Sequence, residues 1–174
     1  MLTPEACDSI RRAVIAVPQP KQDALRPTTI RPYEAKDFEA IYRLDQQCYP
    51  PGIAYSRFGL RMFLAEPGAR AWVAEEGGAL AGFVLVRQVR STRGHVITLD
   101  VRADRRRHGI GRALLDTAEV WLAAQGVRRV RLETAVDNHA ALAFWQQAGY
   151  EVKGTLPGYY LDRDDAYRME KELG

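Results

Sequence analysis

The sequence predicts one α/β domain preceded by a short extension, and three observations lead to this fold class. The chain has 174 residues, a length typical of a single domain. Its composition, with 47% hydrophobic and 27% charged residues, is that of an ordinary globular protein. Apolar residues recur with strand periodicity in some segments and helix periodicity in others, in the order β-α-α-β-β-β-α-β-α-β-β.

Charge and cysteine usage exclude several classes of protein. The net charge of +3 is too small to indicate a nucleic-acid partner. Cys7 and Cys48 lie far apart, so we expect neither a disulfide framework nor a cysteine-based metal site, and a reducing cytoplasm fits. No apolar run approaches the roughly 20 residues of a membrane helix. Glu5 and Asp8 stand where a signal peptide would be apolar, so we expect a cytoplasmic protein without a membrane partner.

Residues 1–28 are predicted to be an extension and linker. Pro4 to Val17 could form a short helix, and Pro18-Gln19-Pro20 and Pro27 then interrupt regular structure. We therefore expect the folded domain to span residues 29–174.

The first half of this domain is predicted to contain three strands and two helices. Asp37 suits a helix N-cap, and the apolar residues that follow keep helical spacing until Pro50-Pro51-Gly52. Glu76-Gly77-Gly78 is typical of a hairpin turn. The predicted elements are strand Thr29–Pro32, helix Phe38–Cys48, helix Tyr55–Ala65, strand Ala71–Ala74 and strand Leu80–Val89.

The second half is predicted to alternate strands and helices. His95–Val101 is apolar on both faces, which indicates a central strand. Gly126 ends the next helix, and Asn138 can cap the one after it. The predicted elements are strand His95–Val101, helix Gly109–Gln125, strand Val127–Val136 with Arg129, Arg131 and Glu133 on one face, a helix from Asn138 to Gly149, and strands Tyr150–Thr155 and Ala166–Leu173 joined by Leu156–Asp165.

The turn between strand His95–Val101 and the helix at Gly109 has the features of an anion site. It is rich in arginine, and Gly109 and Gly111 let backbone N–H groups approach a ligand at a helix N-terminus. A phosphate or pyrophosphate is the expected anion. The chain lacks the lysine-containing loop of P-loop proteins, and Leu114 stands where a dinucleotide fingerprint needs a small residue. Coenzyme A is the third class of phosphate-bearing ligand that such a turn can bind.

Arg106-x-x-Gly109-x-Gly111 resembles the Arg/Gln-x-x-Gly-x-Gly/Ala motif of the GCN5-related N-acetyltransferase (GNAT) superfamily. The downstream run Asn138-x-x-Ala141-x-x-Phe144-Trp145-x-x-x-Gly149-Tyr150 resembles it as well, and the similarity extends from about Thr29 to the end. The resemblance implies a mixed, mostly antiparallel sheet, splayed between strands 4 and 5 and flanked by helices on both faces. It also implies that acetyl-CoA binds in the splay and that its acetyl group passes to a primary amine by direct attack in a ternary complex.

The resemblance implies the residues that hold acetyl-CoA. Backbone groups around Leu99 and Val101 would pair with the pantetheine arm, and amides from Arg107 to Arg112 would hold the pyrophosphate. Arginines of the turn would meet the nucleotide phosphates, although an arginine-rich turn can also be merely solvated. The implied residues are Leu99, Asp100, Val101, Arg106, Arg107, His108, Gly109, Ile110, Gly111, Arg112, Asn138, Ala141 and Trp145.

The C-terminal run Gly158-Tyr159-Tyr160-x-Asp162 resembles protein N-terminal acetyltransferases, both the RimI-like type that acts on ribosomal-protein alanine and the archaeal and eukaryotic catalytic subunits. In that group the tyrosine pair lies between the last two strands and contacts the acceptor backbone. Tyr49 and Pro50 would form the other wall of the groove. The alternative for the tyrosines is a packed hairpin. The alternative functions are acetylation of a small amine or a lysine side chain, and binding of acetyl-CoA without catalysis.

The resemblance also implies the catalytic groups. Glu133 would take the proton of the attacking amine through a water molecule, unless it only forms an ion pair with Arg131. His95 would be a second proton acceptor or have no role. Trp145 replaces a tyrosine that protonates the leaving thiolate in many relatives, and an indole is not a useful acid. Either no acid is needed and Trp145 is a core residue, or Tyr159 supplies the proton.

Overall fold

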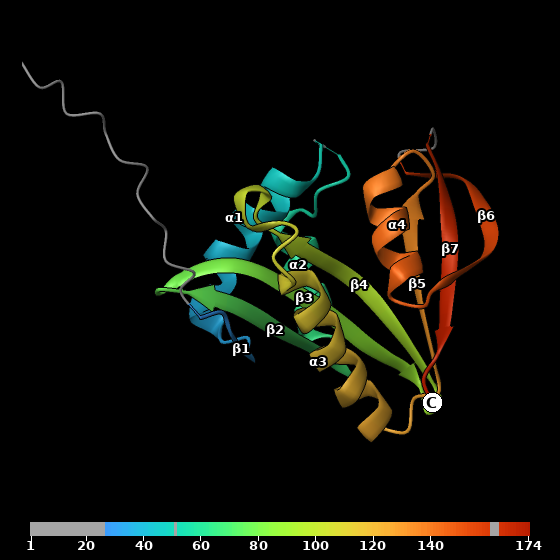
Figure 1. The fold of residues 1–174 in the computed structure, drawn as a ribbon, viewed down its shortest axis with the longest axis horizontal. Coiled ribbons are helices and arrows are strands. Elements are labelled where there is room, and N and C mark those ends of the chain that lie inside the picture. Colours follow the sequence, from blue (N-terminus) through green and yellow to red (C-terminus); the bar gives the residue numbers. More distant parts are fainter. Residues whose placement is uncertain (1–26, 51, 161–163) are drawn as a thin grey trace, which may run out of the picture.

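The computed structural model describes residues 27–50, 52–160 and 164–174, so the predicted helix Pro4–Val17 and Pro51 lie outside the described residues. A seven-stranded sheet with the strand order β1-β2-β3-β4-β5-β7-β6 forms the centre of the domain (Figure 1). The strands are β1 (Thr29–Pro32), β2 (Ala69–Glu76), β3 (Ala79–Arg90), β4 (Arg93–Val101), β5 (Arg129–Ala135), β6 (Glu151–Tyr160) and β7 (Asp164–Glu172). The helices are α1 (Phe38–Cys48), α2 (Arg57–Ala65), α3 (Ile110–Ala124) and α4 (His139–Gln147), with short 3-10 turns η1 (Ala35–Asp37) and η2 (Ala103–Arg105).

All neighbouring strands run antiparallel except β4 and β5, which are parallel. A parallel pair needs a crossover connection, and α3 provides it. The predicted mixed, mostly antiparallel sheet with a central β4 is therefore confirmed. Every helix predicted within residues 29–174 is present, and the described residues contain no helix that is long and apolar enough to cross a membrane.

Helices cover both faces of the sheet, so the domain has two hydrophobic cores. Strand residues of alternating parity face opposite sides: Trp72 and Val84 pack with α3 and α4, whereas Val73 and Phe83 pack with α1 and α2. The α3 helix contributes its predicted apolar stripe to the first core through Ile110, Leu114, Ala118 and Leu122. Burial on both faces explains why β3 and β4 are rich in apolar residues.

Three local expectations were wrong. The Asp37 side chain does not cap α1, because it accepts hydrogen bonds from the Arg31 guanidinium at 2.7 and 2.9 Å and from the Glu34 backbone N–H. Helix α2 begins at Arg57 rather than Tyr55, because the Ser56 hydroxyl accepts a hydrogen bond from the Gly59 N–H and caps it. Strand β6 continues through the segment expected to be a connection and ends at Tyr160.

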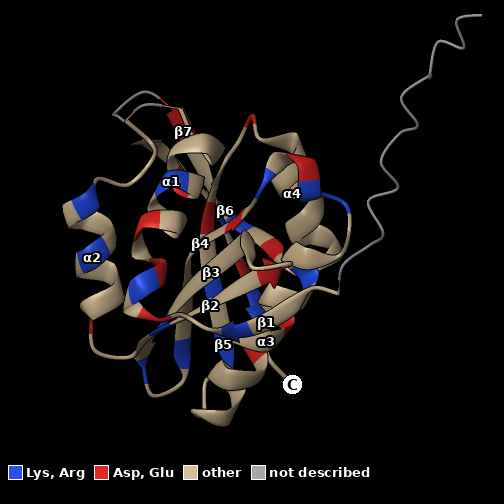
Figure 2. Cartoon of the chain, turned by 90° about the vertical axis from the view of Figure 1, so that its left-hand side faces the viewer, with Lys and Arg blue, Asp and Glu red and all other residues tan. Residues whose placement is uncertain are grey.

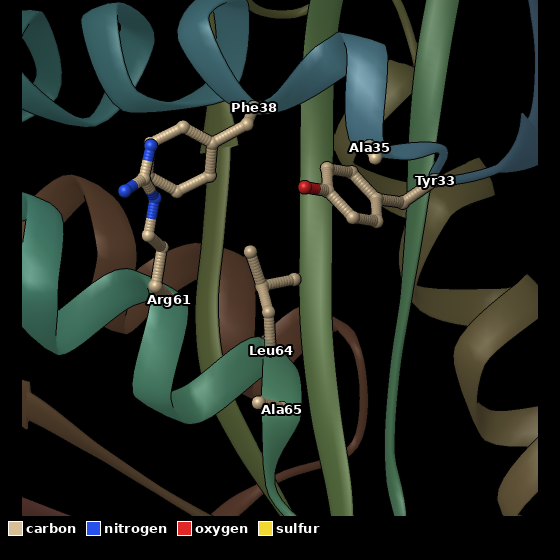
Figure 3. Close-up of a pocket in the computed structure, with 6 residues that line it drawn as sticks. All are labelled: Tyr33, Ala35, Phe38, Arg61, Leu64 and Ala65. Atoms are coloured by element: carbon tan, nitrogen blue, oxygen red, sulfur yellow. The ribbon is translucent and has the colours of Figure 1, made fainter.

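A shallow hollow of about 340 Å³ lies between the start of α1 and the end of α2 (Figure 3). Tyr33, Phe38 and Leu64 make its lining largely apolar, and the Arg61 guanidinium lies 4.5 Å from the centre of the Phe38 ring. It shares no residue with the predicted active site. Charged residues of both signs are interspersed over the helices and strands (Figure 2).

Candidate active site

Strands β4 and β5 separate soon after they meet (Figure 1). They pair only through Arg93–Arg129, Gly94–Val130 and His95–Arg131. Beyond His95, β4 continues to Val101 without pairing with β5 in the described chain. The backbone of that segment can therefore receive another extended group, as the edge of a sheet does.

A β-bulge turns the side chains of β4 just beyond the point of separation. Leu85 of β3 pairs with Thr98, and the next residue, Val86, pairs with Val96, so Ile97 is the extra residue. Leu99 and Val101 consequently pack against the α3 core. Thr98 is directed toward Tyr49 at the end of α1.

His95 and Glu133 meet where β4 and β5 diverge. The His95 Nε2 lies 2.6 Å from the Glu133 Oε2, and both side chains are largely buried, at 17% and 9% exposure. Burial raises the pKa of the Glu133 carboxyl, but the hydrogen bond with His95 and the electrostatic interactions with His95 and Arg131 outweigh it, so the pKa lies below its ordinary value. The predicted catalytic pair is therefore in direct contact, and Glu133 is a carboxylate at neutral pH.

Tyrosines flank this pair on two sides. Tyr159 and Tyr160 lie at the end of β6, with ring centroids 5.0 Å apart, rather than in a connecting loop. Burial and the charge of Glu133 raise the pKa of Tyr159, and burial raises the pKa of Tyr160 to about 12. Both hydroxyls are therefore protonated at neutral pH and can donate hydrogen bonds.

The second wall comes from the connection between α1 and α2. The Tyr55 hydroxyl donates to the Ile97 carbonyl at 3.3 Å, and the Tyr49 hydroxyl lies 3.4 Å from Thr98 Oγ1. Burial raises the pKa of Tyr55, and the nearby Tyr159 and Tyr160 add to this effect. The two predicted walls are thus close to one another, although the Tyr49 hydroxyl points into the protein. Pro50 is exposed beside it.

The arginine-rich turn has the backbone geometry of an anion site. Gly109 has a positive φ of 81° and precedes α3, and Arg107 has the unusual φ of 65°. A Cβ atom built on Gly109 meets nothing within 4 Å, so the space before the helix is open. Backbone N–H groups in successive conformations of opposite hand, followed by a helix N-terminus, attract anions. The Ile110 side chain is buried, so only its amide can serve the site.

The arginines of the turn are not equivalent. Arg105 forms an ion pair with Glu76 at 2.9 Å, and Arg112 pairs with Asp116 at 2.8 Å. Arg106 donates to the Val101 carbonyl at 3.1 Å. In the described part of the chain, the Arg107 side chain has no hydrogen-bond or ion-pair partner. Arg107 is thus the cation of the turn most available to an anion. His108 also belongs to the turn, and its Nδ1 lies 2.8 Å from the Arg106 carbonyl oxygen.

Helix α4 packs close to the start of α3, where a Cβ built on Gly111 would lie 3.5 Å from Phe144 Cε2. Asn138 caps it as predicted, accepting a hydrogen bond from the Ala141 N–H at 3.1 Å. Trp145 is buried, and its ring packs edge-on against Phe144 and Tyr150 at centroid distances of 4.9 and 5.5 Å. This packing is that of a core residue.

The sequence did not reveal a pair of buried carboxyl groups behind β4. Asp100 is 2% exposed and Asp45 is fully buried, and each has one carboxyl oxygen without a hydrogen-bond partner in the described chain. The Asp100 Oδ1 accepts from Thr98 at 3.2 Å, and the Asp45 Oδ2 accepts from the Tyr55 backbone N–H at 2.8 Å. Burial raises the pKa of Asp45 to about 6, and burial together with the charge of Asp45 raises that of Asp100 to about 7.

The expected contact of Asp100 with the cofactor therefore remains a prediction for its backbone, not for its side chain. That side chain faces the end of α1, while its neighbours Leu99 and Val101 face the α3 side. A signal for the second carboxyl was present, because Asp45 falls between Ile41 and Cys48 on the apolar stripe of α1. A polar residue on such a stripe is worth noting, since buried charges are expensive.

The comparisons with known proteins agree with this geometry. A model of the acetyltransferase (GNAT) family matches residues 38–150. The chain belongs to this family. Over 82% of its length it is 31% identical to an uncharacterized N-acetyltransferase of Methanocaldococcus jannaschii, covering 90% of that protein. It is 26% identical to an N-alpha-acetyltransferase of Saccharolobus solfataricus, over 88% of this chain and 98% of that one.

Solved structures show the same fold. The crystal structure of Ard1 from Thermoplasma volcanium has a TM-score of 0.78 and 28% identity, covering 84% of this chain and 98% of that one. The Escherichia coli ribosomal-protein-S18-alanine N-acetyltransferase has a TM-score of 0.76 at 24% identity, covering 85% of this chain and 95% of that one. The GNAT fold predicted from the motifs is therefore confirmed.

As a member of the GNAT family, the chain is an acetyl-CoA-dependent N-acetyltransferase, and its residues fit that cofactor. The unpaired edge of β4 at Leu99 and Val101 suits an extended arm with amide groups, and the open N-terminus of α3 suits a pyrophosphate. Acetyl-CoA supplies the acetyl group and a thiolate that leaves readily. The chain itself must bind the two ends and receive the proton of the amine.

Gly111→Val is expected to weaken acetyl-CoA binding by about tenfold or more, because branched side-chain atoms would crowd Leu99 of β4 and Phe144 of α4 beside the proposed cofactor site. A Cβ at Gly111 already lies 3.5 Å from Leu99 Cδ2 and from Phe144 Cε2. The dissociation constant can be measured by isothermal titration calorimetry, with Gly154→Ala on β6 as the control, since its Cβ would meet only the Arg168 guanidinium at 3.7 Å. Unchanged affinity in folded Gly111→Val would contradict this assignment of the cofactor site.

Asp100→Asn is expected to stabilise the protein, and to do so more at pH 8 than at pH 5. The folded-state pKa of about 7 lies above the ordinary value, so stability is lost as the pH rises from about 4 to 7 and the loss is complete above that range. The amide has no charge to bury. The gain in unfolding free energy should be about 2 kcal/mol larger at pH 8, measured by denaturant titration. Asp116→Asn on the surface of α3 is the control, and an equal gain at both pH values would exclude a raised pKa at Asp100.

Proposed function

We propose that this GNAT enzyme acetylates the N-terminal α-amine of a protein or peptide, and that residues 29–174 form its catalytic domain. The carrying observation is the His95–Glu133 pair, which lies at the separation of β4 and β5 with tyrosines on two sides. The naming of relatives as N-alpha-acetyltransferases in Saccharolobus solfataricus, Sulfurisphaera tokodaii and Schizosaccharomyces pombe supports the same acceptor. So do structural neighbours solved with a peptide and with a bisubstrate analogue.

Glu133 and His95 act together on the proton of the amine. The acceptor arrives mainly as an ammonium ion and must lose a proton before it attacks. A carboxylate can receive that proton through one water molecule, and a histidine held at 2.6 Å can share it. The ring N–H of a neutral His95 would donate to the Glu133 carboxylate, which leaves its other nitrogen able to accept a proton. Attack is direct, within a complex that contains both substrates.

Backbone and tyrosine groups complete the site. A backbone N–H near Leu99 would donate to the carbonyl oxygen of the thioester and stabilise the negative charge that develops there. We assign the Tyr159 hydroxyl as the proton donor to the leaving thiolate. Together with Tyr160 it would also bind the backbone of the acceptor. Because burial and Glu133 raise the pKa of Tyr159, proton transfer from it to a thiolate is uphill, so its larger contribution should be to acceptor binding.

Glu133→Gln is expected to lower kcat by about 100-fold near neutral pH, because the amide keeps the shape of the side chain but cannot accept the proton. Acetyl-CoA affinity should be unchanged, since Glu133 lies on β5 away from the turn at Gly109. The rate of free CoA release with a saturating peptide measures this. Arg129→Gln on the same strand is the control, and equal turnover by Glu133→Gln would remove Glu133 as the base.

Tyr159→Ala is expected to raise the KM for peptides about tenfold while acetyl-CoA binding stays the same, because a hydroxyl and a ring are lost from the acceptor wall. Val152→Ala, which truncates another exposed apolar residue of β6, is the control. The assay uses a library of free N-terminal peptides, with the product mapped by mass spectrometry to the α- or an ε-amine. Products on lysine side chains, or on none of the peptides, would contradict N-terminal acetylation.

A further inference from the structure

One arginine, Arg131, lies beside the His95–Glu133 pair and has no carboxylate other than Glu133 within ion-pair distance in the described chain. Arg131 precedes Glu133 by two residues on β5, so the two side chains lie on the same face of the sheet. Its Nε lies 3.9 Å from the Glu133 Oε1, and in the described part of the chain no other carboxylate is within ion-pair distance of it. The side chain is half exposed, at 49%. Its guanidinium can therefore take up a further anion.

The neighbouring arginines on this face are already engaged. Arg129 forms ion pairs with Glu172 and, at 3.9 Å, with Glu170. Arg168, the partner of Glu133 across the β5–β7 pair, lies 3.6 Å from Glu170. Glu170 is the partner of Arg131 in the β5–β7 pair, but its carboxylate lies within 4 Å of Arg168 and Arg129 instead. Within ion-pair distance, Arg131 thus differs from its neighbours in having only Glu133, the residue proposed to accept a proton.

Arg131 also lies close to the acceptor wall. Its charge acts on the hydroxyl of Tyr159 as well as on the carboxyl of Glu133. His95 is its partner in the parallel β4–β5 pair. An amine that reaches Glu133 between the tyrosines therefore brings the first residues of its own chain near this guanidinium.

We propose that Arg131 selects acceptors with an aspartate or glutamate at the second or third residue. This inference rests on the proposed N-terminal acetylation. Two residues along a strand span about 6.7 Å, and an extended peptide advances by the same amount, so a carboxylate at these positions matches the separation of Arg131 from Glu133. A guanidinium binds a carboxylate with two parallel hydrogen bonds, which gives both charge and direction.

Binding of an acidic acceptor would also help the base. While Arg131 has Glu133 as its only counter-ion, its charge favours the ionised carboxylate and weakens Glu133 as a proton acceptor. A carboxylate of the acceptor would draw the guanidinium away and neutralise that charge. Selectivity would then be visible in kcat as well as in KM, which distinguishes this role from simple attraction of a charged ligand.

The test compares three peptides that differ only at the second and third residues, carrying aspartate, glutamine or lysine there. The wild-type enzyme should show kcat/KM about fivefold higher for the aspartate peptide than for the glutamine peptide, with the advantage shrinking as salt rises from 0.05 to 0.5 M, as expected for a partly exposed charge pair. Arg131→Gln should abolish this preference, and Arg131→Glu should reverse it toward the lysine peptide. Arg129→Gln, of similar exposure on the same strand, should keep it.

The outcomes separate this inference from the proposed function. Equal kcat/KM for the three peptides, or a preference that survives Arg131→Gln, overturns the role of Arg131 while N-terminal acetylation stands. Acetylation of none of the peptides overturns the proposed function itself. Circular dichroism and acetyl-CoA affinity establish that each variant is folded, and Arg131→Lys should retain the sign of the preference with a smaller magnitude, because a lysine keeps the charge but not the paired hydrogen bonds.

Discussion

The arrangement of the site depends on the short pairing of β4 with β5. A parallel pair joined by a helix would ordinarily continue along both strands, yet this one ends at His95. The backbone of β4 beyond that point is left for a ligand, and the N-terminus of α3 stands at the open end of the gap. The same divergence brings His95 and Glu133 together at its base. The unpaired edge of β4, the open N-terminus of α3 and the contact of His95 with Glu133 therefore follow from one feature of the sheet.

The sequence predicted most of the fold because its signals are local. Apolar periodicity indicated each helix and strand that the structure describes. Asn138 begins α4 as an N-cap, and Gly126 follows the end of α3, as their chemistry favours. Where a local prediction was wrong, another interaction had formed in place of the expected one. Asp37 was expected to cap a helix, but the Arg31 guanidinium, which also donates to Glu75 of β2, takes its carboxylate. A strand partner for Leu156 cannot be seen before the β6–β7 register is known.

The site was predictable only where a motif records it. The glycines before α3, and His95 and Glu133 as separate candidate residues, could be expected from a family pattern, whereas the contact between His95 and Glu133 could not. The association of Asp45 with Asp100 could not, because it joins α1 to β4 across more than fifty residues and leaves no spacing to read. The packing of Trp145 against Tyr150 similarly needs the folded core.

The domain handles its two buried acidic groups on β4 and β5 in opposite ways. Glu133 has a histidine at 2.6 Å and an arginine near it, and these lower the pKa of its carboxyl although burial opposes them. Asp100 has no ion pair in the described chain, and burial together with the charge of Asp45 raises its pKa. A carboxyl group that holds a proton near neutral pH can be buried at little electrostatic cost, whereas one that must accept a proton has to stay ionised and reachable. Burial raises the pKa of both groups, so the charges placed around each one decide which of them stays ionised and able to act on an amine.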